Sequence, residues 1–320
     1  MASPPSCMYL DIPGLTVRLA LAGIALRSSD ITEIGRGADN AVFVAYRDDD
    51  VPVVIKVRTT TRRARYATAA WASHQLQAVR VAAPEHIWHD DDIYVESRVI
   101  GTPVDIAADE STRELAAIES GRVLRAVHSL PVVGFGRLDP TGRAPHVTLA
   151  AWLTGQQRPP PPVPPGSRAS LGTRAATALR ELAPSLRPRP PCLLHGDWVA
   201  RHVLTRGGRV VGVIDLESVR GGDPMADLAG WSLQEPADLT EALFVGYRLD
   251  RLNEDTCLRL VLHRIRIGLA LTRYHLATGG RNRARLHAGQ IEADLNDLDA
   301  GHLRPAPRIA PPRSQQHPTT

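Results

Sequence analysis

The chain has 320 residues, of which 43% are hydrophobic and only 4% are aromatic, and its formal net charge is +4. A chain of this length can bury a sizeable core, either in one large domain or in two lobes. Acidic and basic residues are interspersed, without a basic stripe or interleaved aromatic residues, so the composition argues against a nucleic-acid-binding protein.

The first hundred residues have the pattern of a small antiparallel β lobe. A helix or strand over Leu15–Leu26 precedes residues whose hydrophobic character alternates with a period of two, as in half-buried strands. The pattern predicts a meander of three strands, at Ile31–Gly35, Ala41–Tyr46 and Val51–Val57. A helix is predicted next, over Thr59–Val79, and Pro84 ends it. Two further strands are predicted at Ile87–Trp88 and Ile93–Val99. The turn Gly35–Asn40 could fold over a ligand, or it could be an ordinary hairpin.

The rest of the chain is mainly helical in pattern. Helices are predicted at Leu115–Leu130, Thr173–Leu182, Leu239–Leu249, Thr256–Leu276 and Arg285–Leu298. We therefore expect an α+β fold with an N-lobe over residues 1–98 and a C-lobe over residues 99–300. A proline-rich stretch at 157–165 predicts an exposed loop, and residues 301–320 have the composition of a disordered tail.

One basic residue differs from all the others. Of the 38 lysines and arginines, only Lys56 is a lysine, and it lies near the end of the third predicted strand. A lysine ammonium is a compact point charge that suits a position between phosphate oxygens, whereas arginine is a rigid planar fork. Chance survival of a single lysine is the alternative interpretation.

Acidic residues gather in the segment 192–231, next to runs of valine, leucine and isoleucine. They form three groups: His195-Gly196-Asp197 with His202 five residues after the aspartate, Ile214-Asp215, and Gly222-Asp223-Pro224 with Asp227. Carboxylates at the ends of buried strands can hold a divalent cation and accept a proton. Together with Lys56 and a glycine turn, they are what phosphoryl transfer from a nucleotide requires.

These motifs, in this order, resemble those of the aminoglycoside phosphotransferase (choline kinase-like) family over about residues 31–300. The resemblance implies a bilobal, protein kinase-like fold and a phosphotransferase that uses ATP or GTP with Mg²⁺, or with Mn²⁺ as the alternative. It implies that Asp197 is the catalytic base, that Asp215 is the principal metal ligand and that Lys56 binds the α and β phosphates.

The resemblance also assigns supporting roles around this centre. It implies that Asp39 and Asn40 lie in a loop over the phosphates, and that Ser97 and Val99 offer backbone groups to the purine. His195 is expected to fix the loop that carries Asp197. Asp223 and Asp227 are expected to brace the site rather than to contact substrate.

Two positions depart from the family pattern. His202 occupies the place of an asparagine that binds Mg²⁺, and imidazole suits Mn²⁺ and later metals better than Mg²⁺. It could bind metal weakly, contact phosphate or leave a second metal site empty. The second departure is a missing acid, because no aspartate or glutamate occurs between Asp50 and Glu85 to pair with Lys56. Glu96 is one alternative partner, and bound phosphate alone is the other.

The HxDxxxxH spacing, in place of HxDxxxxN, resembles the phosphotransferases that inactivate capuramycin-type nucleoside antibiotics. We therefore expect an antibiotic kinase, with a nucleoside antibiotic or an aminoglycoside-like compound as its hydroxylated acceptor. The arginines and histidines in the segment 258–285 favour a neutral or anionic acceptor over a polycationic one. A primary-metabolite kinase and a nucleotide-binding pseudokinase are the alternatives.

The sequence also indicates a compartment. Its three cysteines, Cys7, Cys192 and Cys257, are far apart and form neither a disulfide framework nor a metal-binding pattern. No apolar run approaches the ~20 residues that cross a bilayer, and the N-terminus lacks the pattern of a signal peptide. We expect a cytoplasmic protein without a membrane partner, and the sequence does not indicate an oligomeric state.

Overall fold

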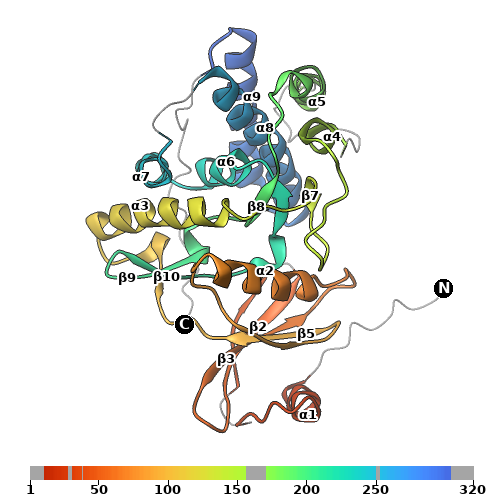
Figure 1. Cartoon of the computed structure of the whole chain (residues 1–320), viewed down its shortest axis with the longest axis vertical. Coiled ribbons are helices and arrows are strands. Elements are labelled where there is room, and N and C mark those ends of the chain that lie inside the picture. The colour runs from red at the N-terminus through yellow and green to blue at the C-terminus, as the bar shows by residue number, and fades with distance from the viewer. Residues whose placement is uncertain (1–10, 28–30, 38, 156–170, 250–252, 304–320) are drawn as a thin grey trace, which may run out of the picture.

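The computed structural model describes residues 11–27, 31–37, 39–155, 171–249 and 253–303. An antiparallel sheet with two helices comes first in the chain, and a mainly helical part follows (Figure 1). This arrangement confirms the predicted α+β fold. The proline-rich stretch 157–165 and residues 304–320 of the predicted tail lie outside the described residues.

The N-terminal sheet has five antiparallel strands in the order β1-β2-β3-β5-β4. Their bounds are β1 (Thr32–Arg36), β2 (Asn40–Tyr46), β3 (Pro52–Arg58), β4 (His86–His89) and β5 (Ile93–Ser97). All five predicted strands are present, with ends that differ by one or two residues. Lys56 of β3 lies between Val42 of β2 and Tyr94 of β5, so the single lysine stands on the central strand.

The two helices of this part cover opposite faces of the sheet (Figure 1). Helix α1 (Ile12–Leu21) buries Leu15 and Leu19, one helical turn apart, in a cluster with the sheet residues Val53 and Ile55. The segment predicted as helix or strand at Leu15–Leu26 is therefore largely a helix, and it begins earlier than expected.

Helix α2 (Tyr66–Ala78) lies between the sheet and the helical part (Figure 1). Its predicted end at Val79 is correct to within one residue, but its predicted start was wrong. Its start is displaced from Thr59 because Arg65 donates hydrogen bonds to the carbonyls of Glu217, Leu138 and Val219, which tie the preceding segment to the helical part. The helix ends well before Pro84, and Arg80 then adopts a left-handed backbone with φ of 57°.

The helical part contains α3 (Glu110–Val127), α4 (Leu149–Thr154), α5 (Leu171–Leu182), α6 (Met225–Gln234), α7 (Ala237–Tyr247), α8 (Glu254–Ala277) and α9 (Arg281–Asp299). The five predicted helices correspond to α3, α5, α7, α8 and α9, and the sequence analysis missed α4 and α6. Short 3-10 turns occur at Val104–Ile106, Ala183–Ser185, Ala200–His202 and Leu216–Ser218. No helix within these described ranges combines the length and the apolar character needed to cross a membrane.

Two three-stranded sheets in this part position the acidic motifs. Their strands are β6 (Thr102–Pro103), β7 (Gly136–Arg137), β8 (Cys192–Leu194), β9 (Val203–Arg206), β10 (Arg209–Val213) and β11 (Arg220–Gly222). One sheet has the order β10-β9-β6 and the other has the order β7-β11-β8. The first acidic motif follows β8, the second follows β10 and the third follows β11.

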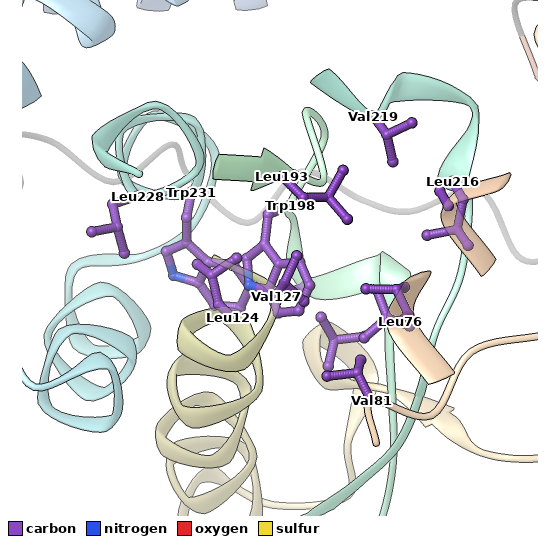
Figure 2. Packing of buried hydrophobic residues seen from close by; sticks show 14 of the residues in the cluster. Leu76, Val81, Leu124, Val127, Leu193, Trp198, Leu216, Val219, Leu228 and Trp231 are labelled. Carbon is purple, nitrogen blue, oxygen red and sulfur yellow. The ribbon is translucent and has the colours of Figure 1, made fainter. Parts of the chain in front are cut away.

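One hydrophobic core joins the sheet side to the helical part. Figure 2 shows Leu76 of α2, with Val81, packed beside residues that flank the acidic motifs and residues of α3 and α6: Leu124, Val127, Leu193, Trp198, Leu216, Val219, Leu228 and Trp231. Trp198 follows Asp197 and Leu216 follows Asp215, and both are almost completely buried. The core therefore anchors the backbone next to both aspartates.

Candidate active site

The loop after β8 carries Asp197 and is fixed from two sides. Asp227 of α6 accepts hydrogen bonds from the backbone N–H groups of His195 at 2.8 Å and Gly196 at 2.9 Å. The His195 ring lies 3.0 Å from the carbonyl of Ile214 through Nε2, and its Nδ1 accepts the Asp197 N–H at 3.3 Å. The expectations that His195 fixes this loop and that Asp227 braces it are confirmed by these contacts.

Gly196 is required by the geometry of this loop. Its φ is +80°, in the left-handed region that favours glycine, and a Cβ at this position would lie 2.1 Å from the carbonyl oxygen of Ser218. The close approach brings the loop that carries Asp197 against the segment that follows Asp215.

Asp223 is also a bracing residue, as expected. It is almost completely buried, accepts a hydrogen bond from the Met225 N–H at the start of α6, and forms an ion pair with the buried Arg259 of α8. This pair links the third acidic motif to α8. Because a buried charge without its partner is strongly destabilising, Asp223 is committed to the fold rather than to a ligand.

Asp215 adopts a left-handed backbone just after β10, with φ of 69° and ψ of 54°. For a residue other than glycine, such a conformation costs on the order of 1–2 kcal/mol, which the surrounding structure must offset. Burial acts to raise the pKa of Asp215, but Lys56 and His202 outweigh burial, so the pKa lies well below the ordinary value. Asp215 is therefore ionised throughout the physiological range.

His202 lies between the two aspartates. Its Nδ1 is 3.0 Å from the backbone carbonyl of Asp197, and its Nε2 is 3.6 Å from Oδ2 of Asp215. Burial lowers the pKa of His202, and the nearby Asp215 and Asp197 only partly offset this, so the ring is neutral at pH 7. A carbonyl oxygen can only accept, which assigns the proton of the neutral ring to Nδ1 and leaves the Nε2 lone pair towards Asp215.

A divalent cation fits this arrangement. Asp197, His202 and Asp215 each offer one ligand atom, and these atoms lie within 4.8 Å of one another. A lone pair that faces a carboxylate is an unfavourable contact unless a proton or a cation lies between the two atoms. The donor set of two carboxylates and one imidazole suits Mn²⁺ as well as Mg²⁺.

Lys56 meets three carboxylates, one from β5 and two from the turn that follows β10. Its Nζ lies 2.8 Å from Glu217, 3.4 Å from Glu96 and 3.5 Å from Asp215. Helix α2 contains no aspartate or glutamate. The alternative that Glu96 pairs with Lys56 is confirmed. Burial acts to lower the pKa of Lys56, but the three carboxylates outweigh it and raise the pKa, so Lys56 stays charged.

The sequence analysis missed Glu217, which makes the shortest of these ion pairs. Burial, with smaller contributions from Asp215 and Glu96, raises the pKa of Glu217 to about 8 against the opposing effect of Lys56. Its position in the sequence could have indicated this role, because Glu217 is only two residues after Asp215, in the turn that follows β10. In this chain, Glu217 and Glu96 supply the contacts to Lys56 that an acid on α2 would otherwise provide.

Above pH 8, where Glu217 is ionised, replacing it with Gln should lower kcat/KM for the nucleotide by about tenfold, because Lys56 loses its shortest charge contact and is less well positioned. The measurement is steady-state kinetics with varied nucleotide. Glu241→Gln, at an exposed site on α7, removes a carboxylate elsewhere and should leave the kinetics unchanged. An unaltered kcat/KM in Glu217→Gln would show that Lys56 does not depend on this contact.

Of the predicted nucleotide-binding residues, Ser97 is the last residue of β5 and Val99 lies two residues beyond it. The N–H of Ser97 is already bonded to the Glu85 carbonyl at 2.9 Å, so this group is not free for a purine. Val99 follows β5, and within the described chain its backbone groups have no hydrogen-bond partner. Of the two residues, Val99 is thus the one whose N–H remains available.

Asp39 and Asn40 lie at the start of β2, and their side chains already have partners. Asn40 accepts a hydrogen bond from the Tyr66 hydroxyl at 2.8 Å, and Asp39 accepts one from Thr60 at 3.3 Å. These bonds connect the turn to α2 and to the segment after β3. Residue 38 of the turn lies outside the described residues.

Comparison with known proteins identifies the family to which the sequence is similar. A sequence profile described as the phosphotransferase enzyme family matches residues 30–260. No curated protein matches the chain.

Several solved structures share the fold at low sequence identity. A thermostable mutant of aminoglycoside phosphotransferase APH(4)-Ia, in a ternary complex with ADP and hygromycin B, is 19% identical with a TM-score of 0.71, over 88% of this chain and 97% of that chain. A putative fructosamine-3-kinase from Thermobifida fusca is 20% identical with a TM-score of 0.64, over 88% and 98% of the two chains. Macrolide 2'-phosphotransferase MphH from Brachybacterium faecium is 18% identical with a TM-score of 0.58, over 89% and 98%.

Proposed function

Because the chain belongs to the phosphotransferase enzyme family, we propose that it transfers the γ-phosphate of ATP or GTP to a hydroxyl group of a small-molecule antibiotic and thereby inactivates it. The acceptor is a nucleoside antibiotic or an aminoglycoside-like compound. The observation that carries this proposal is the convergence of Asp197, His202, Asp215 and Lys56, which come from three separate segments of the chain. The aminoglycoside and macrolide phosphotransferases among the similar structures support an antibiotic acceptor.

Asp197 acts as the base in this proposal. Its side chain is 31% exposed, so an acceptor hydroxyl can reach it, while the braced loop holds its backbone in place. It accepts the proton of that hydroxyl and orients the oxygen towards the γ-phosphate. A positioned base of this kind typically contributes about 10²–10⁴-fold to the rate.

Lys56 and Asp215 serve the donor side. Lys56 stays charged and is held on the central strand, where its ammonium neutralises the α and β phosphates of the nucleotide. A bound Mg²⁺ or Mn²⁺ would be held by Asp215 and His202, with Asp197 nearby, and would neutralise charge that builds up on the phosphates. Glu96 and Glu217 position Lys56 for this task, and Val99 offers its backbone to the purine.

The acid limb of the pH–rate profile should depend on His202. Its pKa is lowered by burial below the ordinary value of about 6.5, so the neutral ring that can bind a cation persists from neutral pH to below 6.5. Activity should therefore hold at pH 6.5 and fall only at lower pH, as the ring becomes protonated. The measurement is kcat/KM from pH 5 to pH 8 for wild type and His202→Asn; the same limb in both proteins would exclude His202 as its source.

A primary-metabolite kinase is the second candidate function. It is favoured by the similarity of fold to the putative fructosamine-3-kinase from Thermobifida fusca. The pseudokinase alternative has lost part of its basis, because Glu96 and Glu217 replace the acid whose absence suggested it.

A phosphotransfer screen separates these functions. The purified protein is incubated with ATP or GTP and with Mg²⁺ or Mn²⁺, against nucleoside antibiotics, aminoglycosides, macrolides, free sugars and choline. The expected result is an antibiotic whose mass increases by one phosphoryl group in step with nucleotide consumption. Phosphorylation of a free sugar or choline alone would establish the second candidate, and nucleotide binding without any phosphorylated product would contradict both.

A further inference from the structure

Three arginines lie beside the catalytic loop without a carboxylate partner among the described residues. They are Arg137 on β7, Arg220 on β11 and Arg266 on α8, and we call them the arginine cluster. The two fully buried arginines in the described residues are paired with acids, Arg259 with Asp223 and Arg264 with Asp294. Arg220 and Arg266 are half-buried and lack such a pair.

Arg266 has the least satisfied guanidinium of the three. Its Nε and one Nη are buried without a hydrogen-bond partner within the part of the chain that the structure describes. Its Cζ lies 4.4 Å from the ring centroid of Trp152 on α4, a contact that holds the group in place without using its donors. Burial, together with the charge of Arg220, lowers the pKa of Arg266 to about 9. Unpaired buried donors on a charged group are costly, so a ligand that bonds to them would be bound favourably.

Arg220 connects this group to the catalytic loop. It pairs across the sheet with Arg137 on one side and with Leu194 on the other, immediately before the loop that carries Asp197. Its Nε lies 3.1 Å from the position that a Cβ on Gly196 would occupy, and it donates one hydrogen bond to the Ser218 carbonyl at 3.3 Å. Its terminal nitrogens have no partner within the described residues.

Strand alternation brings Arg220 and Arg266 to the same place. Residues two apart on a strand share a face, so Arg220 and Gly222 of β11 point to the same side of the sheet. A Cβ on Gly222 would lie 3.0 Å from the Trp152 ring, and the guanidinium of Arg266 lies over the same ring. The helices α4 and α8 lie on this side, next to β7 and β8 (Figure 1). Arg220 and Arg266 therefore flank Trp152, between α8 and the loop of Asp197.

A buried histidine adds to the unsatisfied polar groups at this position. His263 is fully buried, neither ring nitrogen has a hydrogen-bond partner within the described ranges, and its ring lies 5.6 Å from that of Trp152. Burial lowers the pKa of His263 to about 4, so it is neutral at pH 7 and can donate one hydrogen bond.

Two acids act on Arg220 through space, Asp227 and Asp197. Asp227 already accepts hydrogen bonds from the loop, Asp197 is the proposed base, and neither offsets the charge of Arg266. A region with several unpaired positive charges repels an amine-rich acceptor and attracts an anionic one. The bidentate fork of an arginine matches the two oxygens of a carboxylate or a phosphate.

We propose that the acceptor of this enzyme carries an oxyanion group, a carboxylate or a phosphate ester, and that the arginine cluster binds this group while Asp197 faces the hydroxyl. The inference rests on the proposed function and specifies its acceptor as an anionic hydroxylated molecule. Arg220 and Arg266 make the principal contacts, and Arg137 contributes at the rim because it is exposed.

A binding experiment that needs no turnover tests the proposal. The full chain is saturated with ADP and Mg²⁺, so that an anion cannot bind at Lys56. It is then titrated in a calorimeter with two pairs of compounds, each an anionic compound and its neutral counterpart. The first pair is D-glucuronate and D-glucose, and the second is uridine 5′-monophosphate and uridine. At least one charged member should bind about tenfold or more tightly than its neutral partner, which equals about 1.4 kcal/mol. The pair that shows the preference distinguishes a carboxylate from a phosphate.

Variants locate the binding. Arg220→Gln and Arg266→Gln should each reduce the preference for the charged member about tenfold. Arg180→Gln, which removes an exposed arginine from α5, should not change it. If Arg266→Gln does not fold, Arg137→Gln at the exposed rim takes its place with a smaller expected loss. Equal affinity for charged and neutral members in both pairs, or a preference that persists in the arginine variants, would overturn the proposal.

The failure of this inference can be told apart from failure of the proposed function. If charged members bind through the cluster but no acceptor is phosphorylated, the anion site stands and the proposed function fails. If the protein phosphorylates neutral or cationic acceptors with a KM that Arg220→Gln does not alter, the phosphotransferase stands and the anion site is wrong.

Discussion

Replacing Asp197 with Ala should lower the rate of phosphotransfer by about 10²–10⁴-fold and leave the fold intact, because the side chain serves as the base for the acceptor hydroxyl. The fold does not depend on this carboxylate. Its contacts are limited to Arg201 at 3.3 Å and His202 at 3.5 Å, and it is 31% exposed. The bonds that hold the loop come instead from Asp227 and His195.

The measurement is kcat with a phosphorylated acceptor, together with a thermal melt of each protein. The melting temperature should change little in Asp197→Ala, whereas Asp227→Ala should lower it, because that change leaves the N–H groups of the loop and Nε2 of His128 without a partner. If Asp197→Ala keeps more than about a tenth of wild-type activity, its removal costs less than about 1.4 kcal/mol and Asp197 is not the base.

Replacing Asp215 with Asn should reduce kcat/KM by about 10²–10³-fold and weaken the apparent affinity for the divalent cation. Asparagine is the sharper test than alanine, because it tolerates the left-handed backbone that Asp215 adopts, whereas alanine adds strain of about 1 kcal/mol. The loss in Asp215→Asn then reports the missing charge rather than a distorted turn. Asparagine retains a neutral oxygen but not the carboxylate that the charge of Lys56 keeps ionised.

The measurement for Asp215→Asn is a titration of activity with Mg²⁺ and Mn²⁺ at saturating nucleotide. The wild type should reach half-maximal activity at a lower metal concentration than the variant, with either metal. Identical metal dependence in the two proteins would mean that Asp215 does not hold the cation.

The sequence predicted those parts of the fold whose local pattern agrees with the tertiary structure. The strands around Lys56 alternate in hydrophobicity, and each one is present at nearly the expected bounds. The start of α2 was missed because the contacts that displace it are tertiary: Arg65 is bonded to carbonyls more than seventy positions away along the chain. Helix α4 was missed because its six residues are too few to show helical periodicity.

The candidate site was predictable to the extent that motifs carry its residues. The positions of Asp197, His202 and Asp215 in their motifs were sufficient to expect a shared site, and the structure brings their ligand atoms within 4.8 Å. The partners of Lys56 and the arginine cluster were not predictable in this way. Glu217, Arg220 and Arg266 gain their roles from the pairing of β11 with β8 and from the packing of α8, which no local pattern encodes.

The most direct test of the account is to follow the labelled γ-phosphate of ATP, or of GTP, in the presence of the acceptor found by the screen, with wild type and Asp197→Asn side by side. The account predicts that the label moves to a hydroxyl of the acceptor with wild type, with one nucleoside diphosphate formed for each product, and that Asp197→Asn transfers almost none. Label that appears only as inorganic phosphate, or transfer that is equal in the two proteins, would contradict it.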